Sequence, residues 1–258
     1  FEMITGQNVV GNPYAPDTID PQVVKIAQNA AHYAVQKPDE VTDLVDFKQP
    51  EISDTDLKAP IYIDFGPTSL SATPWNNITS HQESSTTSWI KDVENNYTNI
   101  GVRVLDGFTA THAGVGSEPA SPVTVDGVEF PLTAWKDGLL VKGEKNQGDV
   151  GPGRIEISQL DVARKYNFTI LAIRFNGSND ARISSYILVG KTESAVKEVM
   201  TGIKDAASFA AANFEEYIAK FENVEPDSEG KVIVEVKGLD TGSAAEGHIN
   251  ALCISLAK

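Results

Sequence analysis

Two tryptophans stand beside planar polar side chains, which is a combination suited to sugar recognition. Trp75 is followed directly by Asn76 and Asn77, and Trp135 lies two residues before Asp137. A flat aromatic ring can stack on the C–H face of a sugar, while amide and carboxylate groups bond its hydroxyls. The alternative is structural, because large aromatic side chains usually lie in cores and asparagines often bond the amides of turns.

A second candidate group lies around a loop rich in Gly and Asn. Arg174 and Arg182 flank this loop, and Tyr186 follows on the next predicted strand. A guanidinium presents several donors in a fixed plane, so the two arginines could clamp an oxygen-rich ligand. The alternative for Arg174 is an ion pair with a carboxylate on a neighbouring strand.

The sequence contains none of the common catalytic motifs for which we searched. No histidine pair has the i, i+4 spacing of a zinc-binding helix, and the chain has no Gly-x-Ser-x-Gly elbow, phosphate loop or dinucleotide fingerprint. Carboxylates are abundant, but no feature of the sequence selects a pair for glycosidase chemistry. We therefore expect no catalytic activity in this chain. The four histidines are His32, His81, His112 and His248.

No metal site is predicted, and the one alternative considered is a structural calcium ion. The loops Asn146–Asp149 and Asn176–Asp180 are rich in oxygen ligands, although neither has the twelve-residue EF-hand spacing. No other cofactor is expected. The single cysteine, Cys253, excludes an internal disulfide and a cysteine-cluster site, and it is predicted to be a small buried hydrophobe.

Charge and hydropathy restrict the partners. The 258 residues carry 36 Asp and Glu against 21 Lys and Arg, a net charge of −15. Nucleic acid and anionic lipid surfaces should repel such a chain. No apolar run approaches the length of a membrane span. Because the chain opens on Phe1, we expect it to be a piece of a longer protein.

The chain is predicted to divide near residue 50. Residues 1–50 hold a helix that begins with Asp20 as the N-cap and Pro21 at the first helical position, and ends before Pro38. Its apolar face is dominated by alanine, which favours close packing. Residues 51–60 form an acidic linker, and residues 61–258 form a second domain.

From Ile61 onward, short alternating segments bounded by Gly, Pro or Asp predict strands. They are Ile61–Phe65, Thr98–Leu105, Gly138–Lys142, Arg154–Leu160, Tyr166–Phe175, Ile183–Val189, Lys231–Lys237 and His248–Leu256. Segments 197–203 and 217–224 are also predicted as strands, with a helical alternative for residues 206–216. The pattern indicates a mainly β chain, an antiparallel β-sandwich with an N-terminal helical segment.

The order of several motifs resembles a jelly-roll domain found in secreted proteins of Bacteroidetes-like bacteria, of the galactose-binding type. The resemblance covers residues 60–258 and implies a module attached to glycan-degrading enzymes. The motifs are Ile61-Tyr-Ile-Asp-Phe-Gly66, Pro74-Trp-Asn-Asn-Ile-Thr79, Gly153–Leu160, Tyr166–Arg174, Asn179–Arg182, Val224–Lys231 and Ile249–Leu252.

The first segment resembles the tail of an SGNH/GDSL-type hydrolase domain from the same bacteria. The resemblance rests on Phe1–Val10 and the alanine-rich helix that ends before Pro38. It implies that the catalytic serine, oxyanion and histidine blocks of such a domain lie upstream of this chain. It also implies a secreted, periplasmic or cell-surface location.

Two functions remain open from the sequence. One is a non-catalytic accessory module that binds a glycan beside a hydrolase, with Trp75, Asn76, Asn77, Trp135, Arg174, Arg182 and Tyr186 as candidate contacts. The other is a structural or surface-interaction sandwich that binds no sugar. An exposed aromatic platform would favour the first, and complete burial of the tryptophans would favour the second.

Overall fold

A computed structural model describes residues 9–10, 21–36, 57–114, 117–142, 152–175, 182–239 and 246–258. The chain forms two compact units, Phe1–Glu51 and Ile52–Lys258. Each is described by itself. The loops considered for calcium, 146–149 and 176–180, lie outside the described residues.

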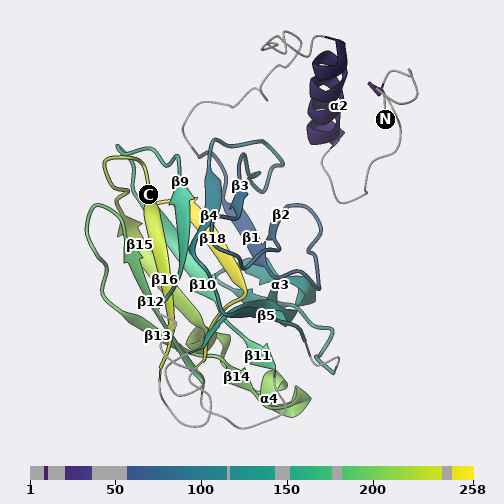
Figure 1. Cartoon of the computed structure of the whole chain (residues 1–258). Coiled ribbons are helices and arrows are strands. Elements are labelled where there is room, and N and C mark those ends of the chain that lie inside the picture. Colours follow the sequence, from purple (N-terminus) through teal and green to yellow (C-terminus); the bar gives the residue numbers. More distant parts are fainter. Residues whose placement is uncertain are drawn as a thin grey trace. The chain divides into compact units, whose positions relative to one another are not determined.

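The first unit contains helix α2 (Pro21–Gln36), as the sequence predicts (Figure 1). The side chains of the predicted alanine-rich face are exposed, and Val23 at its start is 51% exposed.

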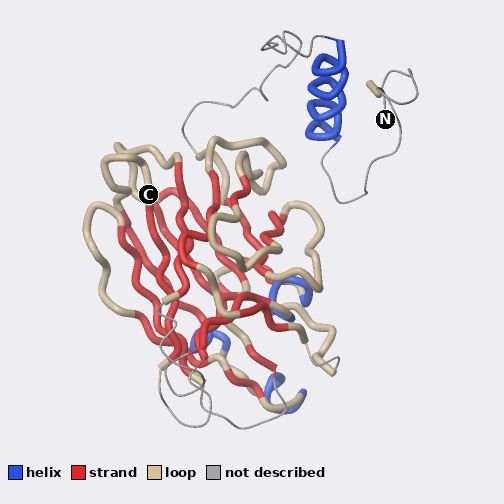
Figure 2. Tube along the Cα trace, in the orientation of Figure 1, coloured by secondary structure: helices blue, strands red, loops and turns tan. Residues whose placement is uncertain are grey.

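The second unit is a β-sandwich, and strands dominate it (Figure 2). We refer to its two large sheets as the five-stranded and six-stranded sheets. The five-stranded sheet has the order β15 (Ile218–Val224), β10 (Tyr166–Leu171), β18 (Ala251–Leu256), β1 (Ile61–Phe65) and β2 (Trp75–Ile78). The six-stranded sheet has the order β13 (Lys197–Met200), β12 (Ile183–Val189), β16 (Val232–Gly238), β9 (Gly153–Ser158), β4 (Gly101–Asp106) and β3 (Thr86–Thr87).

The chain passes repeatedly from one sheet to the other, as in a jelly roll. Strand β9 lies in the six-stranded sheet and the next strand, β10, lies in the five-stranded sheet. Later in the chain, β15 and β18 lie in the five-stranded sheet and β16, between them in sequence, lies in the six-stranded sheet. Apolar side chains from the facing sides of both sheets form the main core, with Ile63, Phe168, Ile155 and Val234 among its fully buried members. Two pairings among the described strands depart from the antiparallel expectation, because β1 runs parallel to β2 and the short strand β11 (Arg174–Phe175) runs parallel to β14 (Gly202–Ile203).

Shorter elements cover one end of the sandwich and the part of the outer face of the five-stranded sheet around Leu171 and Ala251, which are both 0% exposed. These elements are β5 (Ala110–His112), β6 (Val123–Val125), β7 (Val128–Phe130), α3 (Leu132–Lys136), β8 (Gly138–Lys142), β11 (Arg174–Phe175), β14 (Gly202–Ile203), α4 (Ala206–Ala210), the 3-10 turn η2 (Phe214–Tyr217) and β17 (Glu246–Ile249). A second apolar cluster, which includes Trp135, Phe209 and Leu171, fills the space beneath the covering elements.

Several predicted strands are interrupted in the structure. The segment 248–256 divides at Asn250, so that β17 pairs with β8 while β18 joins the five-stranded sheet. The segment 166–175 divides into β10 and β11, and 197–203 divides into β13 and β14. The helical alternative for 206–216 is correct in part, because α4 lies there with the Asp205 carboxylate capping the Ser208 amide.

Candidate functional site

The structure separates the seven candidate residues into three places. Trp135 and Tyr186 lie in the core, 1% and 0% exposed. The Trp135 ring stacks on Phe209 at a centroid distance of 4.9 Å, and its indole N–H donates to the Ser121 carbonyl at 3.3 Å. The Tyr186 hydroxyl donates to the backbone carbonyl of His248. Neither ring is available as a surface platform.

Asn76 holds strand β2 in place. Its amide nitrogen donates to the carbonyls of Tyr62 and Lys91, at 2.9 and 2.8 Å. Its amide oxygen accepts from the backbone N–H of Lys91 at 2.8 Å. The side chain thus imitates a short piece of backbone and fastens β2 between β1 and the following loop. These polar atoms are committed within the protein.

Asn77 is committed in the same way. Its amide oxygen accepts from the Ser71 N–H at 2.8 Å, and its amide nitrogen donates to the Ser71 carbonyl at 2.9 Å. The two asparagines therefore bond backbone, as the structural alternative expected, and they fix the strand on which Trp75 stands.

Trp75 is half-buried and belongs to strand β2. Its ring lies 5.1 Å from the Tyr62 ring, with 38° between the planes, and 5.7 Å from the buried ring of Phe130. Tyr62 is also half-buried. Part of each ring thus remains at the surface, and Trp75 packs against the buried Phe130 ring on its inner side.

The strand register extends this pair into a row across the five-stranded sheet. Trp75 is opposite Tyr62, Tyr62 is opposite Cys253, Cys253 is opposite Thr169, and Thr169 is opposite Lys220. Five strands spaced about 4.8 Å apart give a row roughly 19 Å long. We call these five residues the outer row.

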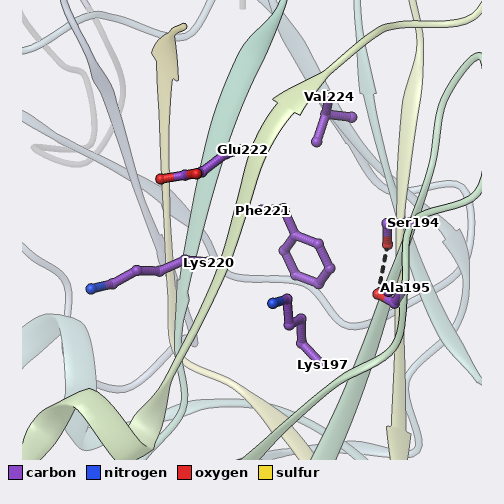
Figure 3. A pocket seen from close by; sticks show the side chains of 7 residues that line it. All are labelled: Ser194, Ala195, Lys197, Lys220, Phe221, Glu222 and Val224. Atoms are coloured by element: carbon purple, nitrogen blue, oxygen red, sulfur yellow. Dashed lines mark hydrogen bonds between the residues drawn. The ribbon is translucent and has the colours of Figure 1, made fainter.

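The outer row lies on the face of the sheet that points away from the main core. The neighbours Ile61 and Ile63 point into that core, and successive side chains of a strand alternate between faces. At the far end, Lys220 leaves β15 on the side opposite to Phe221 (Figure 3). Apart from Cys253, which is 7% exposed, the members of the row are half-buried.

The chemistry of the outer row is graded from aromatic to charged. Tyr62 and Trp75 provide apolar ring faces, and the hydroxyls of Tyr62 and Thr169 can donate and accept hydrogen bonds. Burial, with a smaller effect from the Cys253 thiol, raises the pKa of Tyr62, so its hydroxyl keeps its proton. The Lys220 ammonium is held by Asp126 and Glu215, each at 2.6 Å.

Arg174 and Arg182 are brought together elsewhere, at one end of the sandwich. Arg182 forms an ion pair with Glu246 of β17. Arg174 donates to the Ala113 carbonyl at 2.8 Å and lies 3.1 Å from Nδ1 of His112. The expected clamp is therefore largely satisfied by the protein itself, and the Arg182 side chain is only 13% exposed.

Two buried histidines complete this cluster. The rings of His112 and His248 meet edge to face at 4.9 Å. Burial is the main cause that lowers the pKa of each ring, with further lowering by the nearby arginines, so both rings are neutral at pH 7. The pKa of Glu246 is lowered by its contact with His248 and by Arg182, so this carboxylate stays ionised.

A groove of about 530 Å³ lies between the edge strands β13 and β15 (Figure 3). The ring of Phe221 faces the Ser194–Ala195 segment across it, but this ring is only 4% exposed. Lysine, glutamate and small side chains make up the rest of the lining. The groove thus offers no accessible aromatic face.

Neither a metal cluster nor a membrane helix is found in the described part of the chain. No three His, Cys, Asp or Glu side chains among the described residues are placed to hold a metal ion together. None of the described helices is both long and apolar enough to cross a bilayer.

Comparisons with known proteins reach only distant folds. No protein-family profile matches the chain, and no curated protein matches it in sequence. The solved structures similar to it include protein YxiM from Bacillus subtilis, with 14% identity and a TM-score of 0.37, over 77% of this chain and 40% of that one. The module TmCBM61, solved in complex with β-1,4-galactotriose, has 12% identity and a TM-score of 0.29, over 58% of this chain and 91% of that one.

A third similar structure is the plant receptor-like kinase ANX2, with 8% identity and a TM-score of 0.41, over 70% of this chain and 55% of that one. The chain thus spans less than two thirds of YxiM and of ANX2. At TM-scores below 0.5, none of these likenesses bears on what the chain binds.

Proposed function

We propose that the Ile52–Lys258 unit is a non-catalytic carbohydrate-binding module that holds a glycan on the outer row of its five-stranded sheet. The observation that carries the proposal is the half-buried pair Tyr62–Trp75, two rings 5.1 Å apart at the aromatic end of that row. Such a pair leaves apolar ring surface in contact with water, and a sugar's C–H face would cover it.

The pair is fixed before any ligand arrives. Asn76 fastens β2 to β1 through its amide, and Phe130 supports the Trp75 ring. Because the rings sit on strands and not on a loop, binding would cost little ordering of side chains. A sugar that covers on the order of 70 Å² of ring surface gains about 1.5–2 kcal/mol at 25 cal/mol/Å². That is about a 10–30-fold contribution to affinity.

The polar members of the outer row extend the site beyond a single sugar. Tyr62 and Thr169 supply neutral hydroxyls, and Lys220 supplies a cation that is already neutralised by two carboxylates. The row is therefore suited to an uncharged chain of sugars that crosses the strands. The strongly negative net charge of the protein also favours a neutral glycan over an acidic one.

The sequence resemblances support the wider part of the proposal. They suggest that the module is secreted or exposed at the cell surface and that it follows an SGNH-type hydrolase domain in a longer protein. In that setting it would concentrate the hydrolase on its substrate. We assign no reaction to this chain.

The second candidate function is a purely structural sandwich. It is favoured by the commitment of Asn76, Asn77 and Arg182 to internal partners and by the burial of Trp135. The two candidates differ in one outcome, which is whether the Tyr62–Trp75 pair contacts a glycan.

A glycan array tests the proposal. The full chain, Trp75→Ala, Tyr62→Ala and the control Trp89→Ala are probed in parallel, after thermal unfolding shows that each is folded. Trp89 is half-buried and lies outside the outer row. We expect binding to a neutral oligosaccharide that falls at least 10-fold in the first two variants and persists in the control. Absence of binding by the folded wild-type chain would leave the structural sandwich as the function.

A further inference from the structure

Two buried carboxylates are bound by the loop that leads into the strand carrying Trp75. Asp64 belongs to β1 and Asp137 follows the last residue of α3, and each is 0% exposed. In each carboxylate, Oδ1 is buried and has no hydrogen-bond partner among the described residues. An unsatisfied buried carboxylate oxygen is costly, so two in one place require an explanation.

The other oxygen of each carboxylate is firmly held. Oδ2 of Asp137 accepts from the N–H and hydroxyl of Thr68, both at 2.7 Å, and from the N–H of Ser69 at 3.1 Å. Oδ2 of Asp64 accepts from the N–H of Ser71 at 3.0 Å. The loop between β1 and β2 thus fixes the orientation of both groups.

Several contacts show that the two carboxylates share one environment. The hydroxyl of Ser71, whose N–H bonds Asp64, also bonds the Thr133 hydroxyl of α3 at 2.8 Å. A Cβ added to Gly66, two residues after Asp64, would lie 2.5 Å from the carboxyl carbon of Asp137. Both carboxylates are thus held by the same short loop, through Thr68 for Asp137 and Ser71 for Asp64. Two ionised groups placed in this way would repel each other.

We propose that Asp64 and Asp137 together hold one divalent cation, with calcium as the preferred ion. Carboxylate oxygens suit calcium or magnesium better than zinc or copper. The neutral oxygens next to them are the amide oxygen of Asn77, which is paired with Asp64 in the strand register, and the hydroxyls of Ser71 and Thr133. Such a site needs only two acidic side chains.

The ion would join the β1–β2 loop to α3. It would cancel the repulsion between the two carboxylates and stiffen the loop that leads into Trp75. The competing explanation is a proton shared between Asp64 and Asp137, which would satisfy one oxygen without any metal. A site of this kind predicts metal-dependent stability, whereas a shared proton does not. The inference is independent of whether a glycan binds.

The test is thermal unfolding and calorimetric titration of the chelator-treated full chain with CaCl₂ and MgCl₂. We expect one saturable calcium site, and a rise in Tm of about 5–10 °C when calcium is present at 100 times its Kd. Both effects should vanish in Asp64→Asn and in Asp137→Asn. The control Asp106→Asn changes a half-exposed carboxylate that pairs with Arg154, and it should keep them.

No saturable binding by the wild-type chain would overturn the proposal, and so would binding that persists in both Asn variants. If a variant does not fold, a ¹H–¹⁵N NMR titration of the wild type decides. The largest calcium-induced shifts must then fall on the amides of Thr68, Ser69 and Ser71, because these bond the two carboxylates. Shifts centred elsewhere would equally refute the site.

Discussion

Asn250 connects three parts of the sandwich, and its replacement by alanine gives the sharpest test of the fold. It is 0% exposed and stands where the chain leaves β17 and enters β18. Its amide oxygen accepts from the Ile173 N–H at 2.8 Å. Its amide nitrogen donates to the carbonyls of Trp135 and Asp137, at 2.9 and 2.7 Å.

Asn250→Ala would leave these three buried backbone groups without their partner. At roughly 1–1.5 kcal/mol for each, the free energy of unfolding should fall by about 3–5 kcal/mol. That is a large share of the 5–15 kcal/mol that is typical of a domain. At about 2–4 °C per kcal/mol for a domain of this size, Tm should fall by about 6–20 °C.

The assay is thermal unfolding followed by circular dichroism, with guanidinium unfolding to obtain the free energy. Asn213→Ala is the matched control, because Asn213 is exposed and its amide makes only a 3.5 Å contact with Glu216. The control should move Tm by less than about 2 °C. A fall in Tm of less than 3 °C in Asn250→Ala would show that the three hydrogen bonds do not stabilise the point where the chain passes from β17 to β18.

Three further predictions follow from the buried groups. Gly66→Ala should lower the free energy of unfolding strongly, because φ is +138° and the new Cβ would meet the Asp137 carboxyl. Gly127→Ala is the control: its φ is +77° with nothing within 4 Å, so it should lower the free energy of unfolding by only about 1 kcal/mol. Equal unfolding midpoints for the two variants would refute this contrast. The buried ring of His248 has a lowered pKa, so the unfolded state binds its proton first. Stability should therefore hold above pH 6.5 and fall below it, by at most about 1.4 kcal/mol per pH unit from this group. Urea midpoints at pH 5.0 and 7.0 should differ less in His248→Gln, and an unchanged difference would contradict the assignment. Cys253 is 7% exposed and burial raises the pKa of its thiol, so a thiol reagent should label it only after unfolding; rapid labelling of the native chain would contradict its burial.

Short apolar segments bounded by turn residues were predictable as strands. Ile61–Phe65, Gly138–Lys142 and Ile183–Val189 have the predicted bounds, because each is short and rich in apolar residues and is followed directly by a glycine. The break at Asn250 was not predictable, since neither glycine nor proline marks it within residues 248–256. Its cause is a set of contacts with Ile173, Trp135 and Asp137, which are distant in sequence.

The candidate site was predictable only in part. Trp75 was identified from its polar neighbours, but Tyr62 reads as an ordinary strand residue, and only the β1–β2 register shows that it lies beside Trp75. Arg182 has its ion-pair partner, Glu246, 64 residues away. Asp64 belongs to the motif Ile61-Tyr-Ile-Asp-Phe-Gly66, which we used only to predict the fold. That one of its carboxylate oxygens is buried without a hydrogen-bond partner could not be predicted from the sequence.

The central claim is that a glycan lies on the Trp75 ring, and NMR can observe this contact directly. The chain has three tryptophans, so its ¹H–¹⁵N spectrum should contain three indole N–H signals, which single Trp→Phe variants assign. On titration with a glycan that the array identifies, the account predicts that the Trp75 signal shifts with saturation while the signal of buried Trp135 stays in place. A saturable shift confined to another indole, or none at all with a glycan that binds, would contradict it.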